Sequence, residues 1–215
     1  MKQTNKHPYI CPAERAGGLD NAFRRFLQKP QKILNPFIKT GMTVLDVGCG
    51  PGFFSVEIAK MLNGSGKVIA ADVQDGMLNI IRKKINGTSL QPIIELHKSD
   101  FERIGVVEKV DFVLAFWMVH EVRNKETFFK ELSSILKPDG LILIVEPLFH
   151  VSKKEFSAMV NTIQKCGFSI VHCRDLARRV SFSCSVVLKR YEIKEITADT
   201  LESSNVMPLV WDVFQ

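Results

Sequence analysis

A glycine-rich segment, VLDVGCGPGFFS at residues 44–55, carries the side chains and spacing best suited to holding a ligand. An apolar run ends at Gly48, Gly50 and Gly52, and a helical pattern starts directly after them. Glycines let the backbone turn sharply and approach a ligand closely, and free amides at a helix start face its polar groups. The segment therefore predicts a nucleotide-like ligand.

The spacing of these glycines does not fit the dinucleotide fingerprint. That GxGxxG pattern needs a third glycine three positions after the second, where this chain has Phe53. Asp46 precedes the first glycine and places a carboxylate beside the loop, where it would oppose a pyrophosphate and attract a cation. We therefore expect a ligand that carries positive charge.

Two later positions extend the predicted ligand. Asp72 lies 20 residues after Gly52, at the end of the next apolar run, where a carboxylate can accept hydrogen bonds from both hydroxyls of a ribose. Ser99, Asp100 and Phe101 follow the third run and offer an acceptor for an adenine amine beside an aromatic surface. Asp100 could instead cap the next turn. Together these positions describe a cationic cofactor that contains ribose and adenine.

The elements that must position these residues alternate between short β-branched runs and segments of helical period, which is typical of a parallel sheet covered on both faces. The predicted strands are residues 43–47, 67–72, 92–97, 110–116, 140–146, 168–173 and 181–189, the last two forming an antiparallel addition at a sheet edge. Helical spacing joins Met77, Ile81 and Ile85, and likewise Phe128 or Phe129, Leu132 and Leu136. Ser152 is expected to cap a further helix that runs to Gln164.

The ends of the chain differ from its middle. Four prolines interrupt the helical pattern of the first 40 residues. The predicted organisation is a helical preface over residues 1–40, a main domain over residues 41–195, and a tail over residues 196–215 with no predicted role.

Composition narrows the function classes. The 215 residues include 29 Lys and Arg, 23 Asp and Glu, and 46% apolar residues, as in ordinary globular domains. No segment is apolar for long enough to span a membrane, and the first ten residues lack a signal-peptide core, so we expect a cytoplasmic protein with free cysteines. The net charge of +6 is scattered in short clusters and not gathered on one face, so we expect no nucleic-acid partner. Neither cysteine nor histidine spacing predicts a metal site.

From Thr43 to about Arg190 the chain resembles the class I S-adenosylmethionine-dependent methyltransferases, of the small-molecule type related to the ubiquinone/menaquinone methyltransferases. The resemblance rests on DVGCGPG, AADV, SDF, VDFVLAFWMVHEV and LKPDGLILIVEP, in that order. It implies an α/β fold with a Rossmann-like, doubly wound, seven-stranded sheet, mostly parallel with a reversed edge strand. It also implies S-adenosylmethionine as cofactor and S-adenosylhomocysteine as product.

The resemblance further assigns roles around the cofactor. It implies that Asp46, Gly48 and Gly50 surround the methionine portion, that Asp72 holds the ribose, and that Asp100 and Phe101 contact the adenine. Met77 could line the ribose side or simply pack in the core. The candidate cofactor-binding residues are Asp46, Gly48, Cys49, Gly50, Gly52, Phe53, Asp72, Val73, Met77, Ser99, Asp100, Phe101 and Phe116.

The methyl acceptor is expected where the fourth predicted strand ends, because ligands of open α/β sheets bind at the carboxyl ends of strands. Trp117, His120 and Glu121 lie there. His120 could accept a proton as catalytic base, although a structural histidine bonded to a helix terminus fits equally well. Related small-molecule enzymes use their preface as a lid, so Tyr9, Cys11 and Arg15 could contact the acceptor or merely anchor the preface.

The expected function is methyl transfer to a small-molecule acceptor at oxygen, carbon, sulfur or nitrogen. The exit segment AFWM lacks the D/N-PP-Y/F signature of enzymes that methylate exocyclic or amide nitrogens, and it lacks a Pro-Cys pair. A thiol site for arsenite, built from Cys11 with Cys166, Cys173 or Cys184, has no matching motif. The alternatives are an RNA or protein methyltransferase and a non-catalytic S-adenosylmethionine-binding regulator. The oligomeric state stays open.

Overall fold

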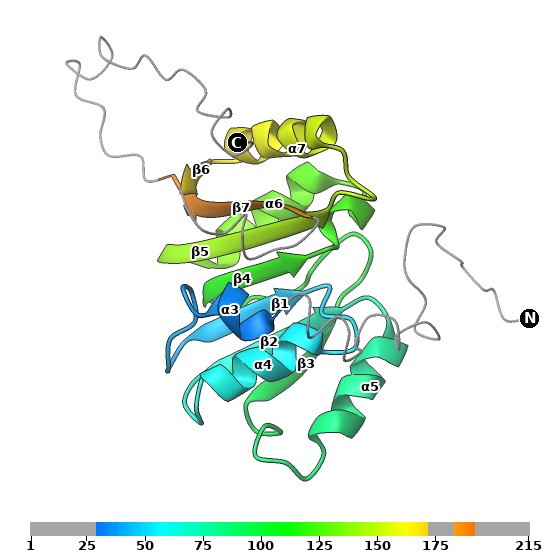
Figure 1. The fold of residues 1–215 in the computed structure, drawn as a ribbon, viewed down its shortest axis with the longest axis vertical. Coiled ribbons are helices and arrows are strands. Elements are labelled where there is room, and N and C mark those ends of the chain that lie inside the picture. The colour runs from blue at the N-terminus through cyan, green and yellow to red at the C-terminus, as the bar shows by residue number, and fades with distance from the viewer. Residues whose placement is uncertain (1–28, 172–182, 192–215) are drawn as a thin grey trace, which may run out of the picture.

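The computed structural model describes residues 29–171 and 183–191. Its centre is a seven-stranded sheet with the order β3-β2-β1-β4-β5-β7-β6 (Figure 1). The strands are β1 (Thr43–Val47), β2 (Lys67–Asp72), β3 (Ile94–Lys98), β4 (Val110–Phe116), β5 (Leu136–Pro147), β6 (Phe168–Val171) and β7 (Ser183–Arg190). Only β7 runs antiparallel to its neighbours, which confirms the predicted sheet. Because β6 forms the edge of the sheet, the reversed strand β7 is the second strand from that edge.

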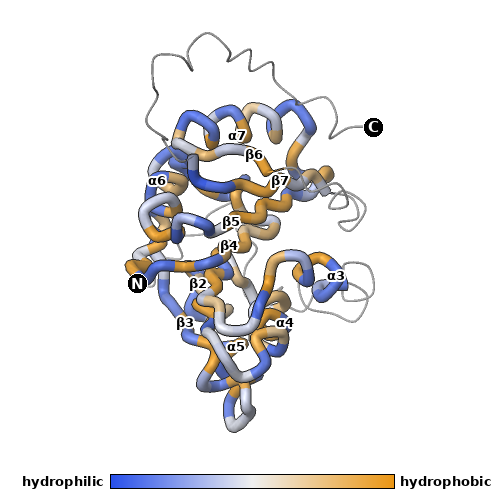
Figure 2. The backbone as a smooth tube through the Cα atoms, turned by 90° about the vertical axis from the view of Figure 1, so that its left-hand side faces the viewer, coloured by the Kyte–Doolittle hydropathy of each residue, from blue (hydrophilic) through white to orange (hydrophobic). Residues whose placement is uncertain are grey.

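Helices cover both faces of this sheet, as the alternating pattern predicted. They are α3 (Pro30–Leu34), α4 (Phe53–Met61), α5 (Asp75–Ile85), α6 (Lys125–Ile135) and α7 (Lys153–Lys165), with a short 3₁₀ helix, η2 (Val119–Glu121). One buried apolar cluster joins the sheet to α3, α4 and α5, and a second joins it to α6 and α7. Figure 2 shows α6 on one side of the strands and α3 and α4 on the other.

Several element boundaries differ from the prediction by one to four residues. Leu136 is wrong as a helical residue, because it begins β5 and pairs with Val110. Pro138 disfavours helical geometry in the residue before it, so the chain leaves the helix early and β5 starts before Gly140. β3 starts two residues later than predicted, since the Ile94 amide donates to the Leu90 oxygen in a turn. The predicted helix capped by Ser152 is present and ends one residue beyond Gln164.

The end of the predicted preface packs against the main domain. Ile33 and Leu34 of α3 are fully buried in the same apolar cluster as α4. The preface before residue 29 lies outside the described residues, so the domain division near residue 40 stays a prediction. Among the described helices, none is both long and apolar enough to cross a bilayer.

Candidate active site

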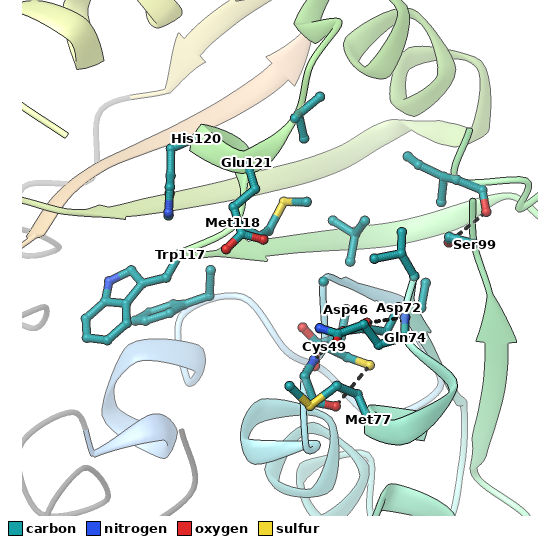
Figure 3. A pocket seen from close by; sticks show the side chains of 18 of the residues that line it. Asp46, Cys49, Asp72, Gln74, Met77, Ser99, Trp117, Met118, His120 and Glu121 are labelled. Carbon is teal, nitrogen blue, oxygen red and sulfur yellow. Dashed lines mark hydrogen bonds between the residues drawn. The ribbon is translucent and has the colours of Figure 1, made fainter. Parts of the chain in front are cut away.

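A cavity of about 330 Å³ opens at the carboxyl ends of the central strands (Figure 3). The loops that follow β1, β2 and β3 line one part of it, and the segments that follow β4 and β5 line another. The cavity lies beside β1 and β4, where the strand order reverses direction along the sheet. This is the position at which open α/β sheets bind their ligands.

The glycine loop between β1 and α4 is held against β2. The amides of Gly48 and Cys49 both donate to the Ala71 oxygen, at 2.9 and 3.0 Å. Gly48 has a φ of +68°, and a Cβ there would lie 2.8 Å from the Met118 side chain, so only glycine fits. Gly50 has a φ of +53°, but a Cβ there would meet no atom within 4 Å. Gly50 lines the cavity, so its side of the loop leaves room for a ligand.

Asp72 connects this loop to the end of β2. Its Oδ2 accepts a hydrogen bond from the Gly50 amide at 2.9 Å, and its Oδ1 accepts one from the Gln74 amide at 2.8 Å. Burial raises the pKa of Asp72, and the two backbone donors offset part of that rise. Each carboxylate oxygen keeps a second lone pair, so the side chain can also accept two hydroxyl donors from a ligand.

Asp46 and Cys49 have different roles in the loop. Asp46 is 2% exposed, and its Oδ2 accepts a hydrogen bond from the Ser55 hydroxyl at 2.5 Å. Burial, together with the negative charges of Asp46 and Asp72, raises the pKa of Cys49 well above its ordinary value. Cys49 therefore stays a protonated thiol, and the loop presents carboxylate charge to a cation without offering a nucleophile.

The predicted adenine side has its polar groups partly engaged within its own loop. Asp100 Oδ1 accepts hydrogen bonds from the amides of Glu102 and Arg103, at 2.8 and 2.6 Å, so it caps a turn. The Ser99 hydroxyl donates to the Ile104 oxygen at 2.9 Å. Both side chains line the cavity, as does Phe101, which is 46% exposed. Direct contact with adenine stays a prediction for all three.

Every predicted cofactor-binding residue except Gly52 lines this cavity. Gly52 precedes α4, and a Cβ there would lie 2.8 Å from Ile81, so this glycine serves helix packing. Met77 is 1% exposed and also lines the cavity, which agrees with both alternatives considered for it. Figure 3 shows Asp46, Cys49, Asp72 and Met77 together at one side of the cavity.

Trp117 occupies the opposite side in an unusual backbone conformation. Its φ is +60°, a region that bulky residues rarely adopt. Its amide donates to the Val145 oxygen on β5 at 2.7 Å, and its indole Nε1 donates to the Ser183 hydroxyl on β7 at 3.0 Å. Strained backbone of this kind persists where neighbouring strands fix it, and it is common at ligand sites.

Aromatic rings form a continuous wall at this side. Ring centroids lie 4.3 Å apart for Phe54 and Phe116, 5.4 Å for Phe116 and Trp117, 5.5 Å for Trp117 and Phe149, and 4.8 Å for Phe149 and His150. All five residues line the cavity. Sequence reasoning missed Phe149 and His150, because the segment after β5 has no periodic pattern to mark which side chains turn inward.

His120 is bonded to a carboxylate that sequence reasoning also missed. Its Nδ1 lies 2.5 Å from Oε2 of Glu146, a fully buried residue near the end of β5. Glu146 Oε1 accepts hydrogen bonds from the amides of Val119 and His120, at 2.7 and 3.2 Å. Burial alone would lower the pKa of His120, but the hydrogen bond and charge of Glu146, with the charge of Glu121, raise it above its ordinary value. Glu146 lies at the end of an apolar strand, as Asp72 does, and this position could have identified it as a candidate site residue from the sequence.

The remaining predicted positions either lie outside the described residues or, for Cys166 and Cys184, do not line the cavity. Tyr9, Cys11, Arg15 and Cys173 lie outside the described residues. Cys166 and Cys184 are free thiols at the end of α7 and on β7. Within residues 29–171 and 183–191, no group of three His, Cys, Asp or Glu side chains gathers as a metal site would require.

Comparison with known proteins agrees with the fold. Residues 44–140 match a family model described as a methyltransferase domain. A crystal structure of an S-adenosylmethionine-dependent methyltransferase from Aquifex aeolicus superposes with a TM-score of 0.73 at 28% identity, covering 83% of this chain and 98% of the other. The chain carries a class I S-adenosylmethionine-dependent methyltransferase domain. Its cofactor is S-adenosylmethionine.

Two curated relatives of this methyltransferase domain have quinone-related names. A demethylmenaquinone methyltransferase from Lactobacillus johnsonii is 32% identical over 130 residues, which is 60% of this chain and 51% of the relative. A ubiquinone/menaquinone biosynthesis C-methyltransferase from Salmonella arizonae is 25% identical over 151 residues, which is 68% of this chain and 60% of the relative. The chain thus spans a little over half the length of the curated relatives it matches.

Proposed function

We propose that this protein transfers a methyl group from S-adenosylmethionine to a small, flat acceptor molecule. The observation that carries this proposal is that one continuous cavity joins the acidic glycine loop to the aromatic wall and His120. The bound cofactor supplies a methyl group on a positively charged sulfur, which becomes a neutral thioether when the methyl group leaves. The protein must then align an acceptor atom with that methyl group and, where needed, remove a proton.

The residues at the glycine-loop side fit this cofactor. Asp72 accepts backbone hydrogen bonds from Gly50 and Gln74, and its carboxylate lone pairs can also accept the hydroxyls of a ribose. Asp46 and Asp72 are almost fully buried, so their negative charges act strongly on a nearby sulfonium. The space beside Gly50 allows the ligand to approach the backbone.

The residues at the opposite side favour a ring-shaped acceptor. Trp117 and Phe149 meet edge to face, at an interplanar angle of 86°, and offer ring surfaces at the cavity. Aromatic side chains bind flat rings through stacked or edge contacts. The quinone-related names of the two curated relatives agree with such an acceptor. We therefore favour a phenol or hydroquinone ring as the acceptor class.

His120 is the proposed catalytic base. It lines the cavity on the acceptor side, and Figure 3 shows it extending toward Trp117. A phenol has to lose its hydroxyl proton whether the methyl group goes to the oxygen or to a ring carbon. Imidazole accepts protons near neutral pH. Because its pKa is raised, His120 becomes protonated at a higher pH than ordinary histidine, so turnover should fall as the solution is acidified.

The experiment follows a radiolabelled methyl group from S-adenosylmethionine. Separate reactions contain a hydroquinone, a phenol, a thiol, RNA or a protein extract, and label is counted in each fraction. The proposal expects enzyme-dependent label in the hydroquinone or phenol. Label that enters only RNA or protein would favour the macromolecular alternative, and RNA binding would then weaken steeply with salt. Cofactor binding without transfer to any fraction would favour a regulator.

A further inference from the structure

We propose that Glu146 is a positioning residue that keeps the proton of neutral His120 on Nδ1, so that Nε2 presents its lone pair to the acceptor. This inference rests on the proposed function for the role of His120, but the proton position itself can be tested without any acceptor.

The proton position follows from hydrogen-bond chemistry. A carboxylate that pairs with a ring nitrogen can only accept, so the nitrogen facing it must carry the hydrogen. Glu146 Oε2 lies 2.5 Å from His120 Nδ1 and is fully buried. In a neutral imidazole the other nitrogen, Nε2, is then the acceptor.

Glu146 is held rigidly enough to impose this arrangement. It lies near the carboxyl end of β5, paired in register with Cys184 of β7. Its Oε1 also accepts the amides of Val119 and His120, so the same carboxylate fixes both the start of η2 and the imidazole ring. Within the described residues, Nε2 of His120 has no hydrogen-bond partner, and the side chain is 23% exposed at the cavity.

Other charged and titratable groups around His120 come from three elements. Glu121 on η2 acts on the ring by charge and favours protonation, while Lys125 on α6 opposes it. His150, in the segment after β5, stacks on the ring at a centroid distance of 5.4 Å. Glu146 combines charge with a direct hydrogen bond to the ring, so it alone of these groups selects which nitrogen carries the proton.

Methyl transfer is accompanied by proton transfer from the acceptor to His120. The acceptor's hydroxyl proton moves to Nε2 and makes an imidazolium ion, whose Nδ1 keeps its own hydrogen and donates it in a hydrogen bond to Glu146 Oε2. The bond between the acceptor atom and the methyl carbon forms as the carbon–sulfur bond breaks, and that electron pair leaves with sulfur. The buried carboxylate stabilises the positive imidazolium that results.

Glu146→Gln is the discriminating substitution. The amide oxygen can still accept the two backbone hydrogen bonds, so η2 keeps its anchor. The amide nitrogen, however, is a donor facing Nδ1, which forces the proton of neutral His120 onto Nε2. Turnover should fall by about 10² or more, while affinity for S-adenosylmethionine stays close to that of the wild type. The acid limb in the pH profile of the residual activity should also disappear.

The test uses nitrogen-15 NMR of the full-length protein with labelled histidine, at a pH where His120 is neutral. The wild type should show a protonated Nδ1 and an unprotonated Nε2, and Glu146→Gln should show the reverse. Glu121→Gln is the matched control, because it removes a neighbouring charge and should keep the wild-type proton position.

Two results would overturn the proposal. One is a wild-type spectrum with the lone pair on Nδ1, which can be read even if the variant fails to fold. The other is a folded Glu146→Gln protein with the wild-type proton position or wild-type turnover. Since the spectra need neither acceptor nor cofactor, failure of methyl transfer to every acceptor would count against the proposed function and leave the Glu146 result intact.

Discussion

Asp72 is a buried carboxylate whose charged form destabilises the protein when no ligand is bound. Its carboxylate is 7% exposed, and burial raises its pKa, which means that folding disfavours its charged form. A raised carboxyl pKa adds stability only at low pH, and that contribution is lost as pH rises through the folded pKa. The charged form of this carboxylate therefore costs the fold stability, as expected of a group proposed to bind a ligand.

Replacing Asp72 with Asn should separate binding from stability. Loss of charged hydrogen bonds to the ribose should weaken S-adenosylmethionine binding by roughly 1.5–3 kcal/mol in calorimetry. The melting temperature without cofactor should change little, because removal of the disfavoured buried charge offsets the one backbone hydrogen bond that the Asn amide nitrogen cannot accept. Asp75→Asn, at an exposed residue outside the cavity, should bind the cofactor normally. Unchanged affinity in Asp72→Asn would remove Asp72 from the site.

His120 provides a pH-dependent prediction of its own, because here folding favours the charged form of the side chain. Because the pKa of His120 is raised in the folded protein, its pairing with Glu146 contributes its full stability at pH values below the unfolded pKa of about 6.5. That contribution is lost as the pH rises through the folded pKa. His120→Asn keeps an N–H donor near the Nδ1 position but does not titrate. Denaturant unfolding should show the wild type gaining stability over this variant as pH falls from about 9 to about 5.5. A stability difference that is constant with pH would contradict the pairing.

The loop between β1 and α4 can be tested by a substitution at Gly50. Gly50→Ala adds a methyl group where no protein atom lies within 4 Å but where the cavity begins. The positive φ should cost about 1–2 kcal/mol of stability. Gly87 also has a positive φ, of +70°, and open space around it, but it lies outside the cavity lining.

Gly50→Ala and Gly87→Ala should therefore lose similar stability in denaturant unfolding, while only Gly50→Ala loses affinity for S-adenosylmethionine in calorimetry. Equal affinities in the two variants would show that the space beside Gly50 is not used by the cofactor.

The elements also show which features sequence can reveal. Hydrophobic periodicity is local, so it located each strand of the sheet and the helix capped by Ser152. It failed at Leu136, where helical spacing continued into a residue that β5 recruits through pairing with Val110. The partnership of His120 with Glu146 depends on β4 and β5 being neighbours in the sheet, so no pattern within either segment could reveal it.

At the scale of the whole molecule, strand order determines the site. β1 and β4 are adjacent although two strands and their connections separate them in sequence, so the glycine loop meets the segment that follows β4. The contact of Gly48 with Met118 marks that meeting point. The proposed cofactor residues come mainly from one half of the sheet and the proposed acceptor residues from the other, with apolar clusters on both faces supporting them.

The most direct test of the account is a thermal-unfolding titration of the whole protein with S-adenosylmethionine, S-adenosylhomocysteine, NAD and ATP. A ligand that binds the native state adds about 2.7 kcal/mol to the free energy of unfolding when present at a hundredfold its dissociation constant. The account predicts a saturable rise in melting temperature with S-adenosylmethionine and S-adenosylhomocysteine, and none with NAD or ATP. A rise with NAD and none with either sulfur compound would contradict it.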